Sequence, residues 1–423
     1  RLPLSLWAVS VGTLNSSDDP RPDSRRPHRR GFVPPTYPLP PRVEPGGLEM
    51  TDWHGFCDRL RDLGDGIVDM PGVDTEQDVV NGQRHLLGLL AGALQESIEF
   101  SDREVPSIYR HNSDTGQWGA PGPDNTYWRA KIEPSGTYRL DGKVPGGRPF
   151  LVQLPEGEMH LGQYGSHGEI TSEELSIEAD GSFELIISAE PHDGDWLRID
   201  GEADHVSIRE YFLDWDVEPG WFVIERLDRI DTFPTPPTPA VFFSQLDRSI
   251  TWTEKTFTFW PDWIQSLRLG SPLNEATSPQ SVPGSADNIA YGGIQFELAP
   301  DEALVIDLET PEAKYWSFAL YDLLWYQSPM FGQRQTSLNK EQVETADGRC
   351  RIVVAHQDPG WPNWLDTTGL QRGSVAYRYV WAETKPTPVA EVVQFAEIRV
   401  DGDPQHRIEQ LTNRRLATQR RFR

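Results

Sequence analysis

The sequence predicts an α+β protein with two antiparallel β-sandwich-like domains, an N-terminal helical unit and a helical segment between the two domains. Three observations support this fold class. Apolar residues recur at helical spacing near the N-terminus and again near the middle of the chain. Short alternating or aromatic runs, separated by Gly, Pro and Asp, fill two other regions. One unit, made of a strand, a turn, a Trp-Leu pair and a second strand, occurs twice.

The helical unit is predicted over residues 50–104. In its first helix, apolar residues fall at spacings of three, four and three, at Trp53, Phe56, Leu60 and Leu63. A second helix is predicted to begin at Thr75, because Thr75 and Asp78 form a variant of the capping box. A third helix, at 240–269, is bounded by Pro-rich and Gly-Ser-Pro segments.

The β-rich regions give the remaining boundaries. We expect a first β-domain at 105–232, a helical connector and linker at 233–283, a second β-domain at 284–403 and a basic tail at 404–423. The predicted strands are 127–132, 137–144, 150–154, 183–189, 206–215 and 221–227 in the first domain, and 294–298, 303–308, 315–324, 350–355, 375–381 and 392–400 in the second.

The charge balance limits the partners. Asp and Glu outnumber Lys and Arg by 65 to 39, and the net charge of −26 disfavours a general nucleic-acid or anionic-membrane surface. No stretch approaches the roughly 18 uncharged apolar residues of a membrane span. The Arg-rich tail at 404–423 is the exception, and it either binds an acidic partner or is a solvated or docked helix end.

The first 49 residues lack Met and are crowded with Pro and Arg. We expect residues 1–49 to be a disordered or non-native extension, with translation beginning at Met50. The apolar run near the start has one basic residue before it and no small-residue cleavage pattern, so it does not predict a signal peptide. This interpretation predicts a cytoplasmic protein.

No cofactor is predicted. The only cysteines are Cys57 and Cys350, too few for a disulfide framework or a four-thiolate zinc site. His160 and His167 are seven residues apart in a Gly-rich loop, which is not the spacing by which a helix presents two metal ligands.

The repeated unit links the two β-domains. Asp180 and Gly181 precede one apolar strand, and Trp196 follows Asp180 by 16 residues; Asp347 precedes the other strand, and Trp364 follows it by 17. Asp-Gly is a hairpin signal, and the Trp would close the end of each sandwich. The indole is either a purely structural plug or a ligand platform.

Four segments of the sequence carry a resemblance to a known family: 123–127, the strand at 137–140, the stretch 334–339, and 358–369 with its Asn-Trp-Leu element. Together they resemble bacterial proteins that carry the domain of unknown function 1214. The resemblance runs from about Met50 to the C-terminus and is best in the last third. It implies β-sandwich domains with helical additions, and it implies no activity, so no catalytic residue is carried over.

The second Trp-Leu turn supplies the catalytic candidates His356, Asp366 and Arg378. Strand ends could bring an imidazole, a carboxylate and a guanidinium to one mouth, for acid/base chemistry and for holding an anionic oxygen. The first unit offers His192, Asp193 and Arg209 in comparable places. The alternative is structural, because Asp at a turn usually caps its own backbone and Arg on a strand often pairs across the sheet.

Further candidates are predicted to bind a ligand. They are Asp124, Asn125 and Tyr127 after a Pro-Gly-Pro turn, Arg334 in a polar loop, and Asn363 and Trp364 at the second Trp-Leu turn. Their structural alternatives are an Asx-turn that starts a strand, a solvated loop and a buried plug.

The function predicted is that of an enzyme or binder acting on a carbohydrate-like or other polar organic small molecule at the mouth of a β-domain. The 15 Trp and 12 Tyr residues offer stacking surfaces, and no nucleophile elbow, phosphate loop or dinucleotide fingerprint is present. The alternative is a non-catalytic interaction or scaffold protein whose aromatic repeats are purely structural. The sequence leaves catalysis and homo-oligomer formation open.

Overall fold

The computed structural model describes residues 51–421 except 114–115, 230, 283–284, 287 and 403. The fold class is confirmed, since the chain is mixed α and β with antiparallel sheets, an N-terminal helical unit and a helix between the β regions. The extension expected at 1–49 lies outside the described residues. No helix in the described part is both long and apolar enough to cross a bilayer.

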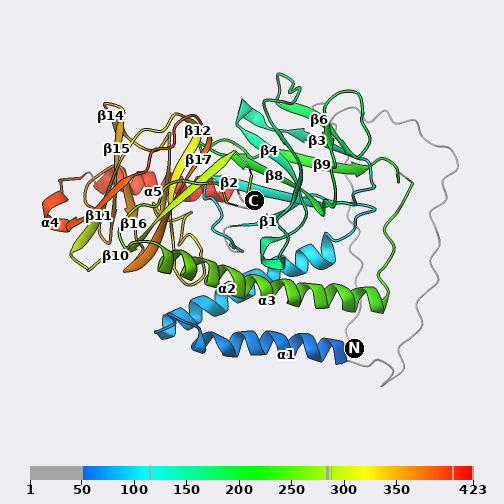
Figure 1. Ribbon diagram of the computed structural model, residues 1–423, viewed down its shortest axis with the longest axis horizontal. Coiled ribbons are helices and arrows are strands. Elements are labelled where there is room, and N and C mark those ends of the chain that lie inside the picture. Colours follow the sequence, from blue (N-terminus) through cyan, green and yellow to red (C-terminus); the bar gives the residue numbers. More distant parts are fainter. Residues whose placement is uncertain are drawn as a thin grey trace, which may run out of the picture. The chain divides into compact units, whose positions relative to one another are not determined.

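Three helices pack against one another beside the sheets (Figure 1). They are α1 (Thr51–Gly66), α2 (Glu76–Leu94) and α3 (Pro239–Gly270), with the short turns η1 (Ile67–Asp69) and η2 (Gln95–Glu99) after α1 and α2. The capping box holds α2, because the Thr75 side chain accepts from Asp78 N at 3.1 Å and the Asp78 carboxylate accepts from Thr75 N at 2.9 Å. Apolar side chains from α2 and α3 form one core with Trp325.

The first sandwich consists of two antiparallel-rich sheets. One has the order β1-β2-β8-β4-β5 and the other β7-β6-β3-β9. The strands are β1 (Tyr109–Asn112), β2 (Asn125–Lys131), β3 (Tyr138–Lys143), β4 (Phe150–Pro155), β5 (Ser166–Thr171), β6 (Ser182–Ser188), β7 (Trp196–Arg198), β8 (His205–Tyr211) and β9 (Trp221–Arg226). Turns η3 (Pro145–Gly147) and η4 (Met159–Leu161) flank β4. Aliphatic and Phe side chains fill the space between the sheets.

The second sandwich has sheets ordered β10-β17-β12-β13 and β14-β15-β11-β18, with β16 paired to β15. Its strands are β10 (Ile289–Glu297), β11 (Glu302–Glu309), β12 (Ala313–Tyr321), β13 (Ser337–Asn339), β14 (Thr345–Ala346), β15 (Arg349–Ala355), β16 (Trp364–Asp366), β17 (Arg372–Ala382) and β18 (Val389–Gln394). Two helices follow, α4 (Phe395–Ile398) and α5 (Pro404–Arg421). This core is richer in aromatic rings.

The two sandwiches share one strand connectivity. The first sandwich pairs its strands in the orders β2-β8-β4-β5 and β7-β6-β3-β9. The second has the corresponding orders β10-β17-β12-β13 and β16-β15-β11-β18, with β2 to β5 matching β10 to β13 and β6 to β9 matching β15 to β18. Trp196 lies on a short strand parallel to β6, opposite Ile186, and Trp364 lies on one parallel to β15, opposite Val353. Each indole N–H donates to the last carbonyl group of the neighbouring strand, at 3.2 Å in the first sandwich and 3.1 Å in the second. The two Trp residues therefore occupy equivalent positions in their sheets, with Trp364 buried and Trp196 half-buried.

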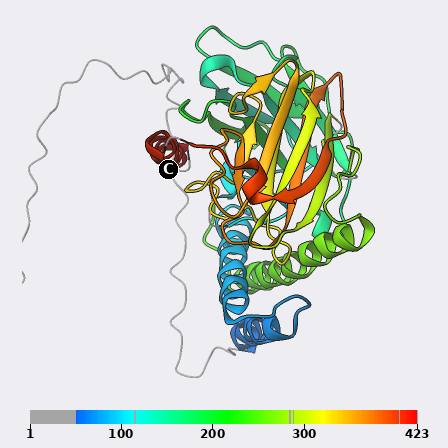
Figure 2. The same cartoon turned by 90° about the vertical axis from the view of Figure 1, so that its left-hand side faces the viewer.

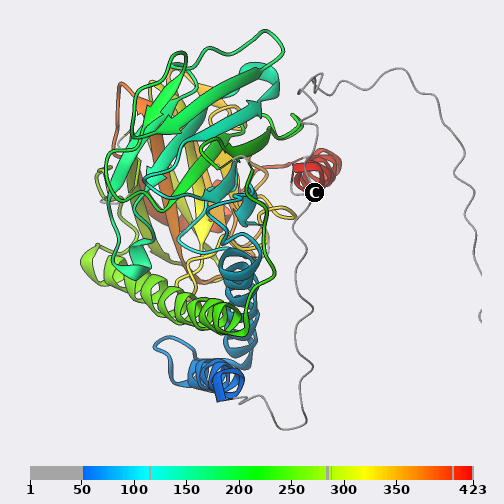
Figure 3. The same ribbon diagram turned by 90° about the vertical axis from the view of Figure 1, so that its right-hand side faces the viewer.

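The sandwiches meet through sheet β1-β2-β8-β4-β5 and sheet β10-β17-β12-β13. Leu151 and Tyr211 of the first sandwich pack with Ile289, Tyr315 and Val380 of the second. We call this contact the seam. Figure 3 shows the first sandwich in front of the second, with the helices at one end of both.

Asp124 joins the two sandwiches at the seam. It is fully buried, and its carboxylate accepts from Trp215 Nε1 at 2.6 Å, Tyr315 Oη at 2.7 Å and Asn339 Nδ2 at 3.0 Å. Trp215 belongs to the first sandwich and the other two donors to the second. A charged acceptor with three donors is well satisfied, so burial of this carboxylate is tolerated.

The basic tail contains helix α5, which docks on both sandwiches (Figure 2). The guanidinium carbons of Arg414 and Arg421 each lie 4.1 Å from the centroid of Trp215. Arg414 also donates to Phe331 O at 2.6 Å and to Ser337 Oγ at 2.6 Å, on the second sandwich. Of the alternatives for this tail, the structure thus shows a docked helix.

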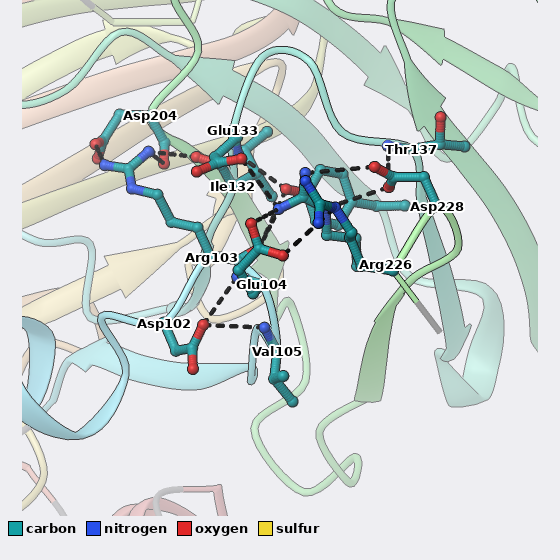
Figure 4. A network of polar contacts seen from close by, with 12 residues as sticks. Asp102, Arg103, Glu104, Val105, Ile132, Glu133, Thr137, Asp204, Arg226 and Asp228 are labelled. Atoms are coloured by element: carbon teal, nitrogen blue, oxygen red, sulfur yellow. Dashed lines mark hydrogen bonds and ion pairs between the residues drawn. The ribbon is translucent and has the colours of Figure 1, made fainter. Parts of the chain in front are cut away.

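An ion-pair network fixes the segment between the helices and the first sandwich (Figure 4). The buried Arg226 donates to Glu104 and Glu133, each at 3.0 Å, and pairs with Asp228 at 3.2 Å. Arg103 contacts the Asp204 carboxylate. Each buried cation here has at least one carboxylate partner.

We expect Asp124→Ala to lower the free energy of unfolding by about 3 kcal/mol, because three buried donors lose a charged acceptor. Urea denaturation followed by Trp fluorescence measures this. The matched control is Asp193→Ala, at an exposed turn, which should change stability by less than about 0.5 kcal/mol. Equal stability of the two variants would show that Asp124 does not hold the seam.

Candidate functional site

Each sandwich places one arginine beside one tyrosine at the same position of its sheet. Tyr127 of β2 pairs with Arg209 of β8, and Tyr291 of β10 pairs with Arg378 of β17. The guanidinium carbon lies 5.3 Å from the ring centroid in the first pair and 5.6 Å in the second. These are cation–π distances. We call the four residues the arginine–tyrosine cluster.

Strand alternation directs these side chains to the seam. Tyr377 and Tyr379 lie in the core of the second sandwich, so Arg378 between them points away from that core. Trp128 packs against the core of the first sandwich, and Tyr127 beside it points the other way. The cluster therefore belongs to the two faces that meet.

The loop before β2 brings the two pairs together. Gly122 N donates to Tyr127 Oη at 2.7 Å, while Arg378 Nη2 donates to Ala120 O at 3.2 Å and Tyr321 Oη at 3.0 Å. A Cβ atom at Gly122 would lie 2.8 Å from Arg378 Nη1, so a larger residue does not fit. Ala120 has a φ of 49°, in the left-handed region that non-glycine residues seldom adopt.

Neither guanidinium group of the cluster has a carboxylate partner among the described residues. Arg378 is 5% exposed, and its Nε atom, like that of Arg209, is buried without a hydrogen-bond partner. Tyr127, Arg209 and Tyr291 are partly exposed, so the cluster reaches the surface. Burying a cation without a counter-ion is costly, and the site therefore favours an anion.

Both arginines are charged. Burial acts to lower the pKa of Arg378 and of Arg209, but neighbouring tyrosines outweigh burial and leave both pKa values raised. Tyr127 acts to raise the pKa of Arg378, and Tyr291 acts to raise the pKa of Arg209; in each case the two residues belong to different sandwiches. Burial raises the pKa of Tyr211, the next residue on this face of β8, to about 12, so its phenol is neutral at neutral pH.

A second buried polar group lies farther along the same face of β2. Arg129 pairs with Glu96 at 3.0 Å and with Glu158, and Lys131 pairs with Glu96 at 2.8 Å and Asp204 at 2.6 Å. Burial raises the pKa of Glu158 to about 7. Burial also acts to raise the pKa of Glu96, but Lys131 and Arg129 lower it below its usual range. The cations of this group are balanced by carboxylates.

The three predicted catalytic residues are distributed over two places. His356 follows β15, with Nδ1 2.8 Å from Thr367 Oγ1 and Nε2 3.3 Å from Leu298 O. Asp366 is buried on β16, and Arg378 lies in the arginine–tyrosine cluster. Within the described part of the chain, no hydrogen bond or ion pair joins His356 to Asp366 or either of them to Arg378.

Three of the predicted ligand-binding residues lie at the second Trp-Leu turn. Arg334 forms an ion pair with Asp366, with Nε 2.8 Å from Oδ2. The Asn363 side chain is buried, donates to Glu344 O at 2.7 Å and accepts from Glu344 N at 2.8 Å. Trp364 is buried and its N–H is used within the sheet. These contacts support the structural alternative for Asn363 and Trp364.

The other three predicted ligand-binding residues lie at the seam. Asp124 has its acceptors filled, as described above, and Asn125 donates to Glu210 O at 2.9 Å. Tyr127 belongs to the arginine–tyrosine cluster. The structure thus brings Asn125 and Tyr127 together with Arg378, although the sequence assigned them to separate groups.

Sequence reasoning did not single out Tyr291, Tyr321 or Tyr211. Arg209 was noted only as the counterpart of Arg378 in the first repeated unit. A signal did exist, because both arginines lie on the strand that follows the Trp-Leu turn. Each is paired with a Tyr on a neighbouring strand, β2 for Arg209 and β10 for Arg378.

A shallow depression of about 150 Å³ lies elsewhere, between residues of both sandwiches. Its lining includes Arg148, Lys314 and Trp381. Arg148 is paired with Glu210 at 2.7 Å, and Lys314 contacts the carboxylate of Glu173. Its cations are thus neutralised, unlike those of the arginine–tyrosine cluster.

Comparison with known proteins identifies the family. The model of the family described as protein of unknown function (DUF1214) matches residues 293–384. The crystal structure of an uncharacterised protein from Burkholderia cenocepacia is 30% identical, with a TM-score of 0.77, over 82% of this chain and 98% of that one. The chain belongs to the DUF1214 family.

The likeness to a second solved structure is weaker. A crystal structure of a protein from Vibrio parahaemolyticus is 12% identical, with a TM-score of 0.43, over 74% of this chain and 100% of that one. Among curated proteins no match was found. The family therefore supplies a fold and no reaction.

A buried histidine in the turn η4 should make the stability of the protein depend on pH. His160 lies between Trp118 and Trp252, with ring centroids at 5.4 and 4.9 Å, and neither of its nitrogen atoms has a hydrogen-bond partner. Burial lowers the pKa of His160 to about 3. Between about pH 6.5 and 3 the unfolded chain therefore binds a proton that the folded chain does not.

We expect His160→Phe to lose part of the acid sensitivity of the protein. In the wild type this histidine lowers the free energy of unfolding by up to about 1.4 kcal/mol per pH unit as pH falls below 6.5. Urea denaturation at pH 7, 6 and 5 measures the slope, with His192→Phe at an exposed turn as control. Parallel pH curves for His160→Phe and wild type would contradict the prediction.

Proposed function

We propose that this DUF1214 protein binds a small polar organic molecule with an anionic group, at the arginine–tyrosine cluster between its two sandwiches. The observation that carries the proposal is the pair of guanidinium groups, Arg209 and Arg378, that have no carboxylate partner among the described residues. A ligand carboxylate or phosphate would provide the missing counter-charge.

The surroundings suit an organic anion. Guanidinium groups bind planar carboxylates through two parallel hydrogen bonds, and the buried Nε atoms of Arg209 and Arg378 have no hydrogen-bond partner in the structure. Tyr127 and Tyr291 add aromatic faces and phenol groups. The low dielectric of a partly buried site strengthens the attraction between the charges.

A neutral carbohydrate is less well supported at this place. Sugar hydroxyls are held by carboxylates and amides, yet Asp124 has its acceptors filled and Asn125 donates to the backbone of β8. A carbohydrate-like ligand fits the cluster when it carries an acidic group. The proposal is limited to binding, because in the described structure no hydrogen bond or ion pair joins His356 or Asp366 to Arg378.

The second candidate is a non-catalytic interaction or scaffold protein. The buried Trp364, whose N–H is used within its sheet, favours this alternative for the aromatic repeat. In that case the cluster would only hold the two sandwiches together, and no small anion would bind. The proposal also includes a cytoplasmic location, an origin of the sandwiches as an internal repeat, and no nucleic-acid partner, the last because of the net charge of −26.

Binding can be tested with thermal shift and isothermal titration calorimetry. The panel contains acetate, benzoate, succinate, citrate and phosphate, with glucose as the uncharged comparison. We expect at least one organic anion to bind and Arg378→Gln or Arg209→Gln to weaken it about tenfold or more, because a charge-assisted contact is lost.

The matched control is Arg351→Gln. Arg351 is also a strand arginine, but it is paired with Asp307 at 2.7 Å in the outer sheet of the second sandwich, so its loss should leave anion binding unchanged. Failure of every anion to bind, or unchanged binding in both cluster variants, would favour the scaffold alternative.

A further inference from the structure

We infer that the ligand is a dicarboxylate, with one carboxylate for the guanidinium group of each sandwich. The inference rests on the proposed function and deepens it by naming the ligand class. It depends on the equivalence of the two arginines, on the charge of their surroundings and on the direction from which each approaches.

The two arginines occupy equivalent positions. Arg209 lies on β8 and Arg378 on β17, and each of these strands is paired on both sides. The pairing partner of Arg209 is Tyr127 on β2, and that of Arg378 is Tyr291 on β10. Each keeps a buried Nε atom without a hydrogen-bond partner. Two equivalent donors predict two equivalent acceptors on the ligand.

The charge of the surroundings calls for two negative charges. The cluster holds two cations, Arg209 and Arg378, and its other two members are tyrosines. The nearby carboxylates are already used: Asp124 accepts from three side chains, and Glu210 accepts from Arg148, Thr126 and Trp128. A monoanion would leave one buried cation unpaired, and that is costly.

The two guanidinium groups come from different sheets on opposite sides of the seam. Arg209 is anchored on the first sandwich and Arg378 on the second, where it also donates to Tyr321 Oη and to Ala120 O in the loop before β2. A ligand with two separate charged groups can meet both. Inorganic phosphate, whose charge is at one centre, meets such a pair less well.

The experiment compares dicarboxylates with matched monoanions. Malonate, succinate, glutarate and adipate are each titrated beside their monomethyl esters, which keep the carbon skeleton and lose one charge, and beside inorganic phosphate. We expect one diacid to bind about tenfold or more tightly than its monoester and than phosphate, because one charge-assisted contact is worth at least that factor.

The variants identify the two ends. In Arg209→Gln and in Arg378→Gln, which keep similar size and remove one charge, the diacid and its monoester should bind within about threefold of each other. Circular dichroism and thermal unfolding confirm that each variant is folded. Arg351→Gln should keep the full preference for the diacid.

The other outcomes overturn either the dicarboxylate inference or the proposed function. Equal affinity of diacid and monoester in the wild type would overturn the dicarboxylate inference and leave the proposed anion site standing. Phosphate binding tighter than every diacid would overturn it too, in favour of a single anion centre. If no diacid, monoester or phosphate binds, the proposed function itself fails.

Discussion

The contact between the two sandwiches is the constraint on which the rest of the structure depends. Two sheet faces that carry many polar side chains meet there, and every buried donor and acceptor needs a partner. Asp124 meets this need by accepting from Trp215, Tyr315 and Asn339, which belong to both sandwiches. Helix α5 adds Arg414, which contacts Trp215 on one sandwich and Phe331 O on the other.

Arg209 and Arg378 differ from the ion-paired arginines of the chain. The chain carries 65 acidic residues, and it places carboxylates beside the buried Arg129, Arg148 and Arg226. At Arg209 and Arg378, in the seam, it places tyrosines instead. A tyrosine face stabilises a cation without cancelling its charge. The cluster thus differs from the structural ion pairs, and the proposed anion would supply the charge that they obtain from carboxylates.

The sequence predicted most of the fold and only part of the site. Helices, strands and the Thr75 capping box follow from local periodicity and capping chemistry, which neighbouring residues determine. The site depends on which sheet faces meet, and no local pattern encodes that. Tyr127 and Arg378 were both selected, but as members of separate groups. His356 and Arg378 were grouped because they are close in sequence, yet His356 follows β15 in the outer sheet and Arg378 lies on β17 in the inner one.

The location of the cluster links ligand binding to the assembly of the fold. Its two arginines belong to different sandwiches, so a ligand that contacts both is bound only when the sandwiches are docked. By mass action such a ligand stabilises the docked state, by about 2.7 kcal/mol at a concentration one hundred times its dissociation constant. The effect is reciprocal. The interactions at Asp124 and α5 hold the sandwiches together without ligand, and so they orient Arg209 and Arg378 before the ligand arrives.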